Sequence, residues 1–369
     1  MTDAIEIARA LMRVDTCNPP GNEQAAAEVL VPRLAGAGFA IEQHRFAPGR
    51  VNLVAVRRSG RMRPVLAFTG HLDTVPLGTA PWRHDPFAGE IHGGRLYGRG
   101  ASDMKAAVAA FVAAALDAQR VEADLALVIT SGEERGCEGA LALARAQIAL
   151  PEISGWIVAE PTSNAIALGH KGALFCFAHF AGVSAHSSAP HLGVNAIYRA
   201  CTAALAFADM DFAARHPVLG QATANVGLIE GGHAPNAVPD RARLHVDVRT
   251  LPGMDHSQVL ARLARLAGEG SRLECVHDLA PVWTDPAAPF VALCAAAREA
   301  EGHVAEPPRG ASFFTDASVL CHLAPAPVVL LGPGEPSQAH VTDEWCGVNE
   351  IETAQNIYGR LIRMHAAAP

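Results

Sequence analysis

Four apolar segments with the length and composition of buried β-strands each end in, or lead shortly to, a polar residue that can bind a metal. They span residues 65–69, 125–130, 156–159 and 327–331. Uninterrupted apolar strands are typical of sheets that are buried on both faces. The pattern therefore predicts an α/β fold, and sheets of this class bind their ligands at the carboxyl ends of the strands.

The first segment leads to His71 and Asp73. Because side chains alternate along a strand, these two residues point to the same side. The Asp73 carboxylate is then expected to accept the Nδ1–H of His71, which leaves Nε2 free to bind a metal. The alternative is an ordinary polar pair in a loop.

Four further candidate ligands follow the later segments or the loops between them: Asp103, Glu134, Glu160 and His340. Two imidazoles and three carboxylates are enough for two metal ions only if one carboxylate bridges, and Asp103, just before an alanine-rich helix, is the candidate bridge. Glu133 would remain unligated and able to accept a proton from water. The alternatives are a helix N-cap for Asp103 and a solvated acidic turn for Glu133 and Glu134.

The middle of the chain has a different order of elements. Strands are expected at 173–181, 222–230, 242–249 and 272–276, and helices at 193–209 and 256–267. This β-α-β-β-α-β order is that of an open-faced α+β sandwich. Since 369 residues exceed one ordinary core, we expect a discontinuous catalytic domain, residues 1–169 and 281–369, with the sandwich of residues 170–280 inserted in it.

The composition limits the partners. The net charge is −8 and there is no basic cluster, which argues against nucleic acids and anionic membranes and favours a small-molecule substrate. The N-terminus lacks the features of a signal peptide, and no apolar run reads as a membrane span. The eight cysteines include no C-x-x-C pair, which favours free thiols in the cytoplasm and metal ligation by His and carboxylates.

Five segments, GHLDTVP, GASDMKAAVAA, SGEERG, AEPT and AHVTDEW, resemble in order and approximate spacing the signature segments of the M20 family of dinuclear zinc amidohydrolases. The resemblance implies a zinc-peptidase-like catalytic domain, with a mixed sheet flanked by helices. It also implies two bound zinc ions, which cobalt or manganese could replace. It also implies these roles: His71 and Glu160 on one zinc, Glu134 and His340 on the other, Asp103 between them, Asp73 orienting His71, and Glu133 as general base.

Longer segments, among them EPTSNAIALGHKG and GVSAHSSAPHLGVNAI, resemble the acetylornithine deacetylase group of that family. This implies hydrolysis of the amide bond of an N-acyl amino acid by zinc-activated water, in a homodimer formed through the inserted lid domain. His186 would contact the scissile carbonyl from the partner subunit. The implied substrate-binding residues are Asn236, Arg249, Thr315, Gly332 and Gly334. The segment SFFTDASVL departs from the expected pattern, so the side-chain specificity stays open.

The same machinery would also serve a succinyl-diaminopimelate desuccinylase, an aminoacylase or a carboxypeptidase. A binding protein that had lost the chemistry would show a damaged ligand set, whereas every candidate ligand and Glu133 are present. A serine or cysteine hydrolase is disfavoured, because the chain has neither a G-x-S-x-G elbow nor a convincing Cys/His pair.

Overall fold

The computed structural model of the protein describes residues 2–60 and 63–367. The chain divides into two compact units, which are described separately. The first comprises residues 1–169, 283–309 and 315–369, and the second comprises residues 170–282 and 310–314.

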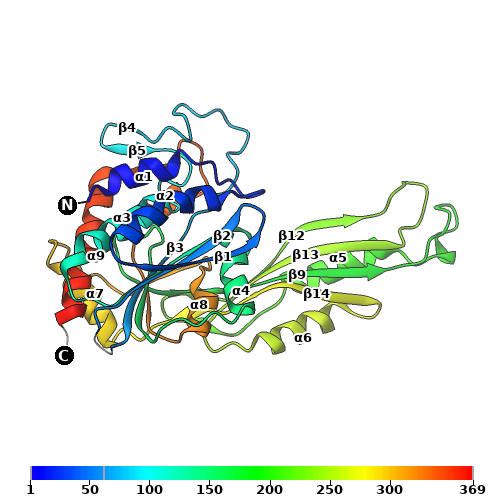
Figure 1. The fold of residues 1–369 in the computed structure, drawn as a ribbon. Coiled ribbons are helices and arrows are strands. Elements are labelled where there is room, and N and C mark those ends of the chain that lie inside the picture. Colours follow the sequence, from blue (N-terminus) through cyan, green and yellow to red (C-terminus); the bar gives the residue numbers. More distant parts are fainter. Residues whose placement is uncertain (1, 61–62, 368–369) are drawn as a thin grey trace. The chain divides into compact units, whose positions relative to one another are not determined.

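A mixed sheet forms the centre of the first unit (Figure 1). Its strands follow the order β1 (Ala40–Ala47), β2 (Arg50–Arg57), β6 (Leu125–Thr130), β3 (Val65–His71), β7 (Ile153–Val158) and β17 (Val328–Leu330). The last four are parallel to one another, whereas β2 is antiparallel to both β1 and β6. The carboxyl ends of β6, β3 and β7 therefore meet at one edge, as expected for apolar strands joined through helices.

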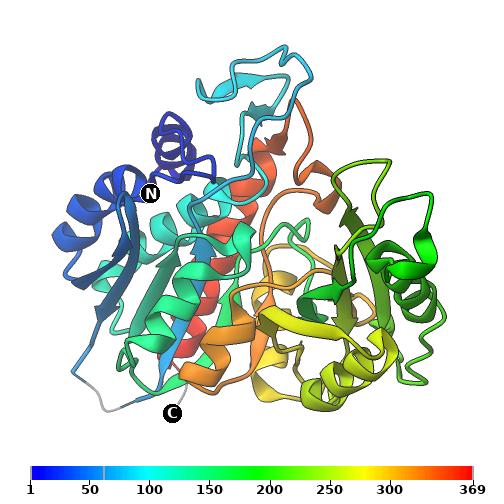
Figure 2. The same cartoon turned by 90° about the vertical axis from the view of Figure 1, so that its right-hand side faces the viewer.

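Helices flank this sheet, which confirms the predicted fold class. They are α1 (Ala4–Met12), α2 (Glu23–Gly36), α3 (Lys105–Asp117), α4 (Glu138–Arg145), α7 (Pro289–Glu299), α8 (Ala317–Leu323) and α9 (Val348–Ala367). Figure 2 shows α9, in red, running along one face of the sheet. There Phe68 of β3 contacts Phe111 of α3 and Tyr358 of α9, with ring centroids 5.9 and 5.4 Å apart. The alanines of α3 are buried around its whole circumference, because small side chains allow neighbouring elements to approach from every side.

Shorter elements complete this part of the chain. A three-stranded sheet joins β18 (Trp345–Gly347), β5 (Arg95–Tyr97) and β4 (Glu90–His92). The strands β8 (Ala167–His170), β15 (Val282–Trp283) and β16 (Arg309–Ala311) each cross the boundary between the two units in the sequence. The short 3-10 helices are η1 (Ala118–Arg120), η2 (Glu133–Arg135) and η4 (Pro336–Gln338).

The second unit has the predicted β-α-β-β-α-β order. It consists of β9 (Gly172–Ala181), α5 (Ala196–Ala208), β12 (Thr223–Gly231), β13 (Arg241–Thr250), α6 (His256–Ala267) and β14 (Ser271–Leu279), with η3 (Pro190–Leu192) and the small hairpin of β10 (Arg215–His216) and β11 (Gly220–Gln221) in its loops. The sheet is antiparallel, with the order β12-β13-β9-β14. One face of β9 and β13 packs with α5 and α6 into a common core.

Residues 310–314 group with the second unit, whereas the sequence placed them in the catalytic segment 281–369. The backbone N–H of Lys171 donates to the carbonyl oxygen of Ala311 at 3.1 Å. The ring of Phe314 packs edge-on against Phe175, with centroids 6.0 Å apart. These long-range contacts are not visible in the local sequence pattern.

In the part of the chain described, none of the helices combines the length and the hydrophobicity needed to cross a bilayer.

Candidate metal centre

The candidate ligands lie where the neighbouring parallel strands of the first unit end. His71 is the last residue of β3, Glu134 lies in η2 just after β6, and Glu160 lies two residues beyond β7. Asp103 lies in the loop before α3, and His340 follows η4. Strand ends at one sheet edge bring together residues that are far apart in the sequence.

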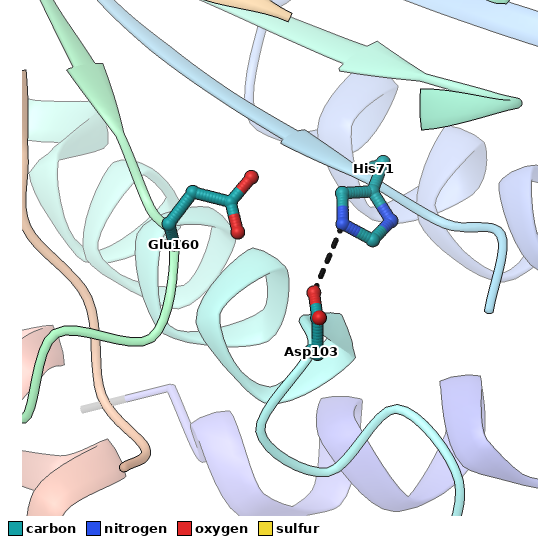
Figure 3. A group of neighbouring side chains, drawn as sticks. All are labelled: His71, Asp103 and Glu160. Atoms are coloured by element: carbon teal, nitrogen blue, oxygen red, sulfur yellow. Dashed lines mark hydrogen bonds and ion pairs between the residues drawn. The ribbon is translucent and has the colours of Figure 1, made fainter. Parts of the chain in front are cut away.

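One donor group consists of His71, Asp103 and Glu160, whose ligand atoms all lie within 4.8 Å of one another (Figure 3). His71 Nε2 lies 3.1 Å from Asp103 Oδ1. His71 and Glu160 are buried, with exposed fractions of 1% and 5%. The group therefore offers one imidazole and two carboxylates that are largely shielded from solvent.

A second donor group consists of Asp103, Glu134 and His340. His340 Nε2 lies 3.0 Å from Glu134 Oε2 and 3.5 Å from Asp103 Oδ2. Asp103 thus belongs to both groups, with Oδ1 facing His71 and Oδ2 facing His340. This is the geometry of a carboxylate that can bind two cations at once.

The charges of these groups fit divalent cations. Burial, together with the charge of Asp103, raises the pKa of Glu134 and of Glu160. Burial alone would also raise the pKa of Asp103, but hydrogen bonds from His340 and His71 lower it below its ordinary value. Among the described residues, no lysine or arginine forms an ion pair with these three carboxylates. Buried carboxylates need a compensating charge, and His and carboxylate donors suit zinc and its neighbours.

Glu133 belongs to neither donor group. Its side chain is buried, and burial raises its pKa. It is therefore a free carboxylate next to the candidate ligands, with a higher proton affinity than an exposed glutamate. The alternative of a solvated acidic turn is wrong, because Glu133 is 7% exposed and the Glu134 side chain 8%.

The Asp73 carboxylate does not accept the Nδ1–H of His71, which corrects the sequence-based expectation. His71 Nδ1 lies 2.9 Å from the backbone carbonyl oxygen of Asp73 and 3.6 Å from its Oδ1. The carboxylate instead accepts backbone N–H groups of Gly132 (2.7 Å) and Glu133 (3.1 Å) at Oδ1 and of Glu134 (3.3 Å) at Oδ2. Three successive N–H donors of a tight turn bind this carboxylate, so Asp73 fixes the turn that carries both glutamates.

Asp103 is not the N-cap of α3. The N-cap is Met104, and its side chain makes no capping hydrogen bond. The Asp103 carboxylate faces the two histidines instead. The alternative interpretation of this residue as a helix cap is therefore wrong.

His186 and Asn236 lie in neighbouring loops of the second unit. A β-bridge joins His186 to Ala237, and the Ser187 N–H donates to the Asn236 carbonyl oxygen. His186 is exposed, and its Nδ1 accepts the backbone N–H of Ser188 at 3.2 Å. Because a backbone N–H can only donate, neutral His186 carries its proton on Nε2. The Asn236 side chain is also exposed.

Arg249 lies in β13 of the second unit. Its Nε and Nη2 donate to Asp247 Oδ2 at 3.3 and 3.0 Å. The guanidinium lies over the rings of Phe175 and Phe314, 5.4 and 5.5 Å from their centroids. These contacts hold the planar group in one orientation, and Nη1 has no hydrogen-bond partner among the described residues.

Thr315, Gly332 and Gly334 form contacts within the first unit. The Thr315 hydroxyl accepts the Ala317 N–H at the start of α8. Gly332 exchanges hydrogen bonds with Thr162, just after Glu160. These contacts do not test whether the three residues bind substrate, so their substrate-binding roles remain predictions.

The sequence pattern does not predict one further residue of this region. Glu344, in AHVTDEW, is completely buried and accepts backbone N–H groups from the loop that carries Asp103. Nothing in the local sequence distinguishes it from the neighbouring Asp343, which pairs with the exposed Arg83. The difference between these two acidic residues appears only in the tertiary structure.

Comparisons with known proteins agree with this geometry. A profile of peptidase family M20/M25/M40 matches residues 67–364. Acetylornithine deacetylase of Myxococcus xanthus is 33% identical over 349 residues, which cover 89% of each chain. Succinyl-diaminopimelate desuccinylase of Phenylobacterium zucineum is 32% identical over 99% of each chain. An M20 family metallo-carboxypeptidase of Sulfolobus solfataricus shares the fold, with a TM-score of 0.83 at 17% identity over the full length of both chains. The chain therefore belongs to peptidase family M20/M25/M40, with the fold of a metal-dependent hydrolase and two candidate donor groups for metal ions.

Proposed function

We propose that this enzyme hydrolyses the amide bond of an N-acyl amino acid, in the manner of an acetylornithine deacetylase. The observation that carries the proposal is the pair of donor groups that share Asp103, with the unligated Glu133 beside them. The similarity to a succinyl-diaminopimelate desuccinylase over almost the whole chain makes an N-succinyl substrate the second candidate. Aminoacylase and carboxypeptidase activities would use the same residues.

In this proposal His71 and Glu160 would hold one metal ion, Glu134 and His340 would hold the other, and Asp103, which belongs to both donor groups, would contribute to each. Zinc suits these donors, and cobalt and manganese accept the same set. When bound, such ions polarise a carbonyl group and make a water molecule more acidic.

Glu133 acts as the general base. Its carboxylate takes a proton from the attacking water and delivers it to the nitrogen of the leaving amine. Burial supports this role, because it raises the proton affinity of the carboxylate above that of an exposed glutamate. The hydrogen bond from the backbone N–H of Glu133 to the Asp73 carboxylate also supports this role, since it fixes the backbone of the general base.

Residues of the second unit would bind the substrate. Arg249 presents an oriented guanidinium to a substrate carboxylate, and the stacked rings of Phe175 and Phe314 and the pairing with Asp247 support this orientation. The Nε2–H of His186 would donate to the oxyanion that develops at the scissile carbonyl. Asn236, in the neighbouring loop, would contact the substrate as well.

The enzyme is proposed to act as a homodimer joined through the second unit. The support is a sheet edge at β12, with Leu228 and Ile229 exposed by 58% and 52%, beside α5, with Tyr198 and Leu205 exposed by 73% and 70%. Apolar side chains at an open sheet edge favour coverage by another chain. His186 is then proposed to serve the site of the partner subunit.

Mixing two inactive variants tests this arrangement. If His186 acts in the partner's site, His186→Ala and Glu133→Gln proteins that exchange subunits should recover about one quarter of wild-type activity, the statistical share of sites with both residues intact. Absence of recovery despite demonstrated exchange would show that His186 acts within its own chain or not at all.

A cytoplasmic location is part of the proposal. All eight cysteines are free in the structure, as suits a reducing compartment.

The adjacent glutamates provide the test of the chemistry. Glu133→Gln should keep two metal ions per chain and lose activity by a factor of about 100 or more, whereas Glu134→Gln should lose metal. Metal content is measured by elemental analysis, and turnover on N-acetyl, N-succinyl and peptide substrates with zinc added. Full turnover by protein shown to be free of metal would refute the proposal, and exchanged phenotypes would reverse the two assignments.

A further inference from the structure

Glu344, the residue before β18, binds four donors of one loop. Its Oε1 accepts the backbone N–H groups of Ser102 (2.8 Å) and Asp103 (3.0 Å). Its Oε2 accepts the N–H of Gly100 (3.0 Å) and Nη1 of Arg99 (2.6 Å). The residue is 0% exposed, so no water competes for these bonds, and hydrogen bonds to a buried carboxylate are strong.

Two more hydrogen bonds fasten the same loop to the same segment. The backbone N–H of Gly98 donates to the carbonyl oxygen of Glu344 at 2.9 Å. The hydroxyl of Ser102 donates to the carbonyl oxygen of Trp345 at 2.7 Å. The loop from residue 98 to residue 103 is therefore fixed along its length, up to the residue that belongs to both donor groups.

The segment that carries Glu344 also carries His340, four residues earlier. The His340 side chain is 54% exposed, and among the described residues its ion-pair partners are the carboxylates of Glu134 and Asp103. Packing alone thus gives His340 little support. The anchor at Glu344 fixes the place at which the His340 segment meets the Asp103 loop.

We propose that Glu344 is a positioning residue of the metal centre. It holds the backbone of Asp103, the residue shared by the two donor groups, and ties it to the segment of His340. Through these bonds it sets the separation of the donors for both ions. The inference rests on the proposed function in one respect, namely that Asp103 is a metal ligand.

Glu344→Gln is the direct test, because glutamine keeps the shape of the side chain and replaces one oxygen by an N–H donor. Each carboxylate oxygen of Glu344 accepts two donors, so the two donors that bound the replaced oxygen then face the glutamine NH2 group, which cannot accept. Zinc affinity, measured by competition with a chromogenic chelator, should fall by about 10- to 100-fold, as for other residues that hold a ligand in place. In the metal-free protein, amide hydrogen exchange in a peptide spanning residues 98–104 should become faster.

Asp343→Asn is the matched control, since Asp343 precedes Glu344 but binds a different loop, accepting hydrogen bonds from Arg83 and from the N–H of His84. Its positive φ of 58° also suits asparagine. This variant should keep wild-type zinc affinity and wild-type exchange.

Variants of Arg99 distinguish a positioning role of Glu344 from a general effect on stability. It is 2% exposed, so Glu344→Gln leaves a buried charge without its partner and could prevent folding. The double variant Arg99→Met/Glu344→Gln removes that charge and should show the same weak zinc binding. Arg99→Met alone keeps the three backbone bonds to Glu344, so it should lose stability but keep zinc affinity within about threefold of wild type.

Three outcomes would overturn the inference. They are wild-type zinc affinity in a folded Glu344→Gln or double variant, wild-type exchange of the loop in either, and an equal loss of affinity in Arg99→Met. Failure of the wild-type protein to bind zinc would overturn the proposed function instead, and the exchange measurement on metal-free protein would still decide whether Glu344 anchors the loop.

Discussion

Replacing Asp73 with asparagine tests whether this carboxylate holds the turn that presents Glu133 and Glu134. The carboxylate is 0% exposed and accepts four N–H groups, three from the backbone of residues 132–134 and one from the side chain of Asn18. Asparagine has the same shape but only one oxygen, so two of these four donors lose their acceptor.

The expected loss of stability in Asp73→Asn depends on the orientation of the asparagine amide. If its oxygen faces Gly132 and Glu133, its Nδ2 faces the Glu134 N–H and Asn18. The Asn18 amide can rotate to accept, because its Oδ1 is buried and has no hydrogen-bond partner in the described part of the chain. The backbone N–H of Glu134 can only donate, so it loses its acceptor. An unpaired buried donor costs about 1–3 kcal/mol of folding stability. The two remaining bonds lose their charge assistance, about 1 kcal/mol each. We expect the variant to lose about 3–5 kcal/mol of stability in the metal-free protein.

Urea unfolding of the first unit, followed together with amide exchange in a peptide spanning residues 131–136, measures the effect. Asp285→Asn is a suitable control, since Asp285 is exposed and its side chain accepts the local N–H of Ala287. A loss below about 1 kcal/mol with unchanged exchange of the turn would refute the anchoring role. Weaker metal binding with unchanged amide exchange of the turn would indicate that Asp73 orients His71 instead.

Two other predictions concern charge. Arg249→Lys should reduce kcat/KM about 10-fold more for substrates with a free carboxylate than for their amides, the equivalent of one charge-assisted hydrogen bond; equal losses in steady-state assays would remove Arg249 from carboxylate binding. Burial and the charge of Asp73 raise the pKa of Glu23 from 4.5 to about 7. The native protein therefore holds a proton there that the unfolded chain has released, so this contribution to stability is complete below pH about 4.5 and is lost as the pH rises toward about 7. Glu23→Gln should flatten the dependence of the urea midpoint on pH in that window, and an unchanged slope would contradict the assignment.

The sequence predicts which residues converge because convergence depends on strand order and strand ends. Apolar runs such as 125–130 mark buried strands, and β6 has these bounds. Parallel neighbours end at one edge, so His71 and Glu160 meet without any knowledge of side-chain contacts. The β-α-β-β-α-β order of the second unit is likewise visible in its alternating strands and amphipathic helices.

Hydrogen-bond partners are not predictable in the same way. The local rule that side chains two apart share a face placed the Asp73 carboxylate against His71. The structure gives that role to the Asp73 carbonyl oxygen, because the carboxylate is occupied by a turn about sixty residues away. Glu344 is comparable, since its donors precede it by more than 240 residues. Such partners are decided by which loops meet in the folded chain.

Both anchors, Asp73 and Glu344, bring a negative charge into a region that already holds several carboxylates. A neutral acceptor would avoid this repulsion, but a neutral side-chain amide has only one oxygen and accepts from fewer N–H groups. The same charges increase the attraction of a cation, so holding the loops and attracting the metal are two effects of one group. Asp73→Glu separates them from Asp73→Asn, because it keeps the charge and displaces the oxygens. If the position of the turn is decisive, both variants should lose activity and loop protection alike. If charge is decisive, Asp73→Glu should keep zinc affinity while Asp73→Asn loses it, which would limit the anchoring role to stability.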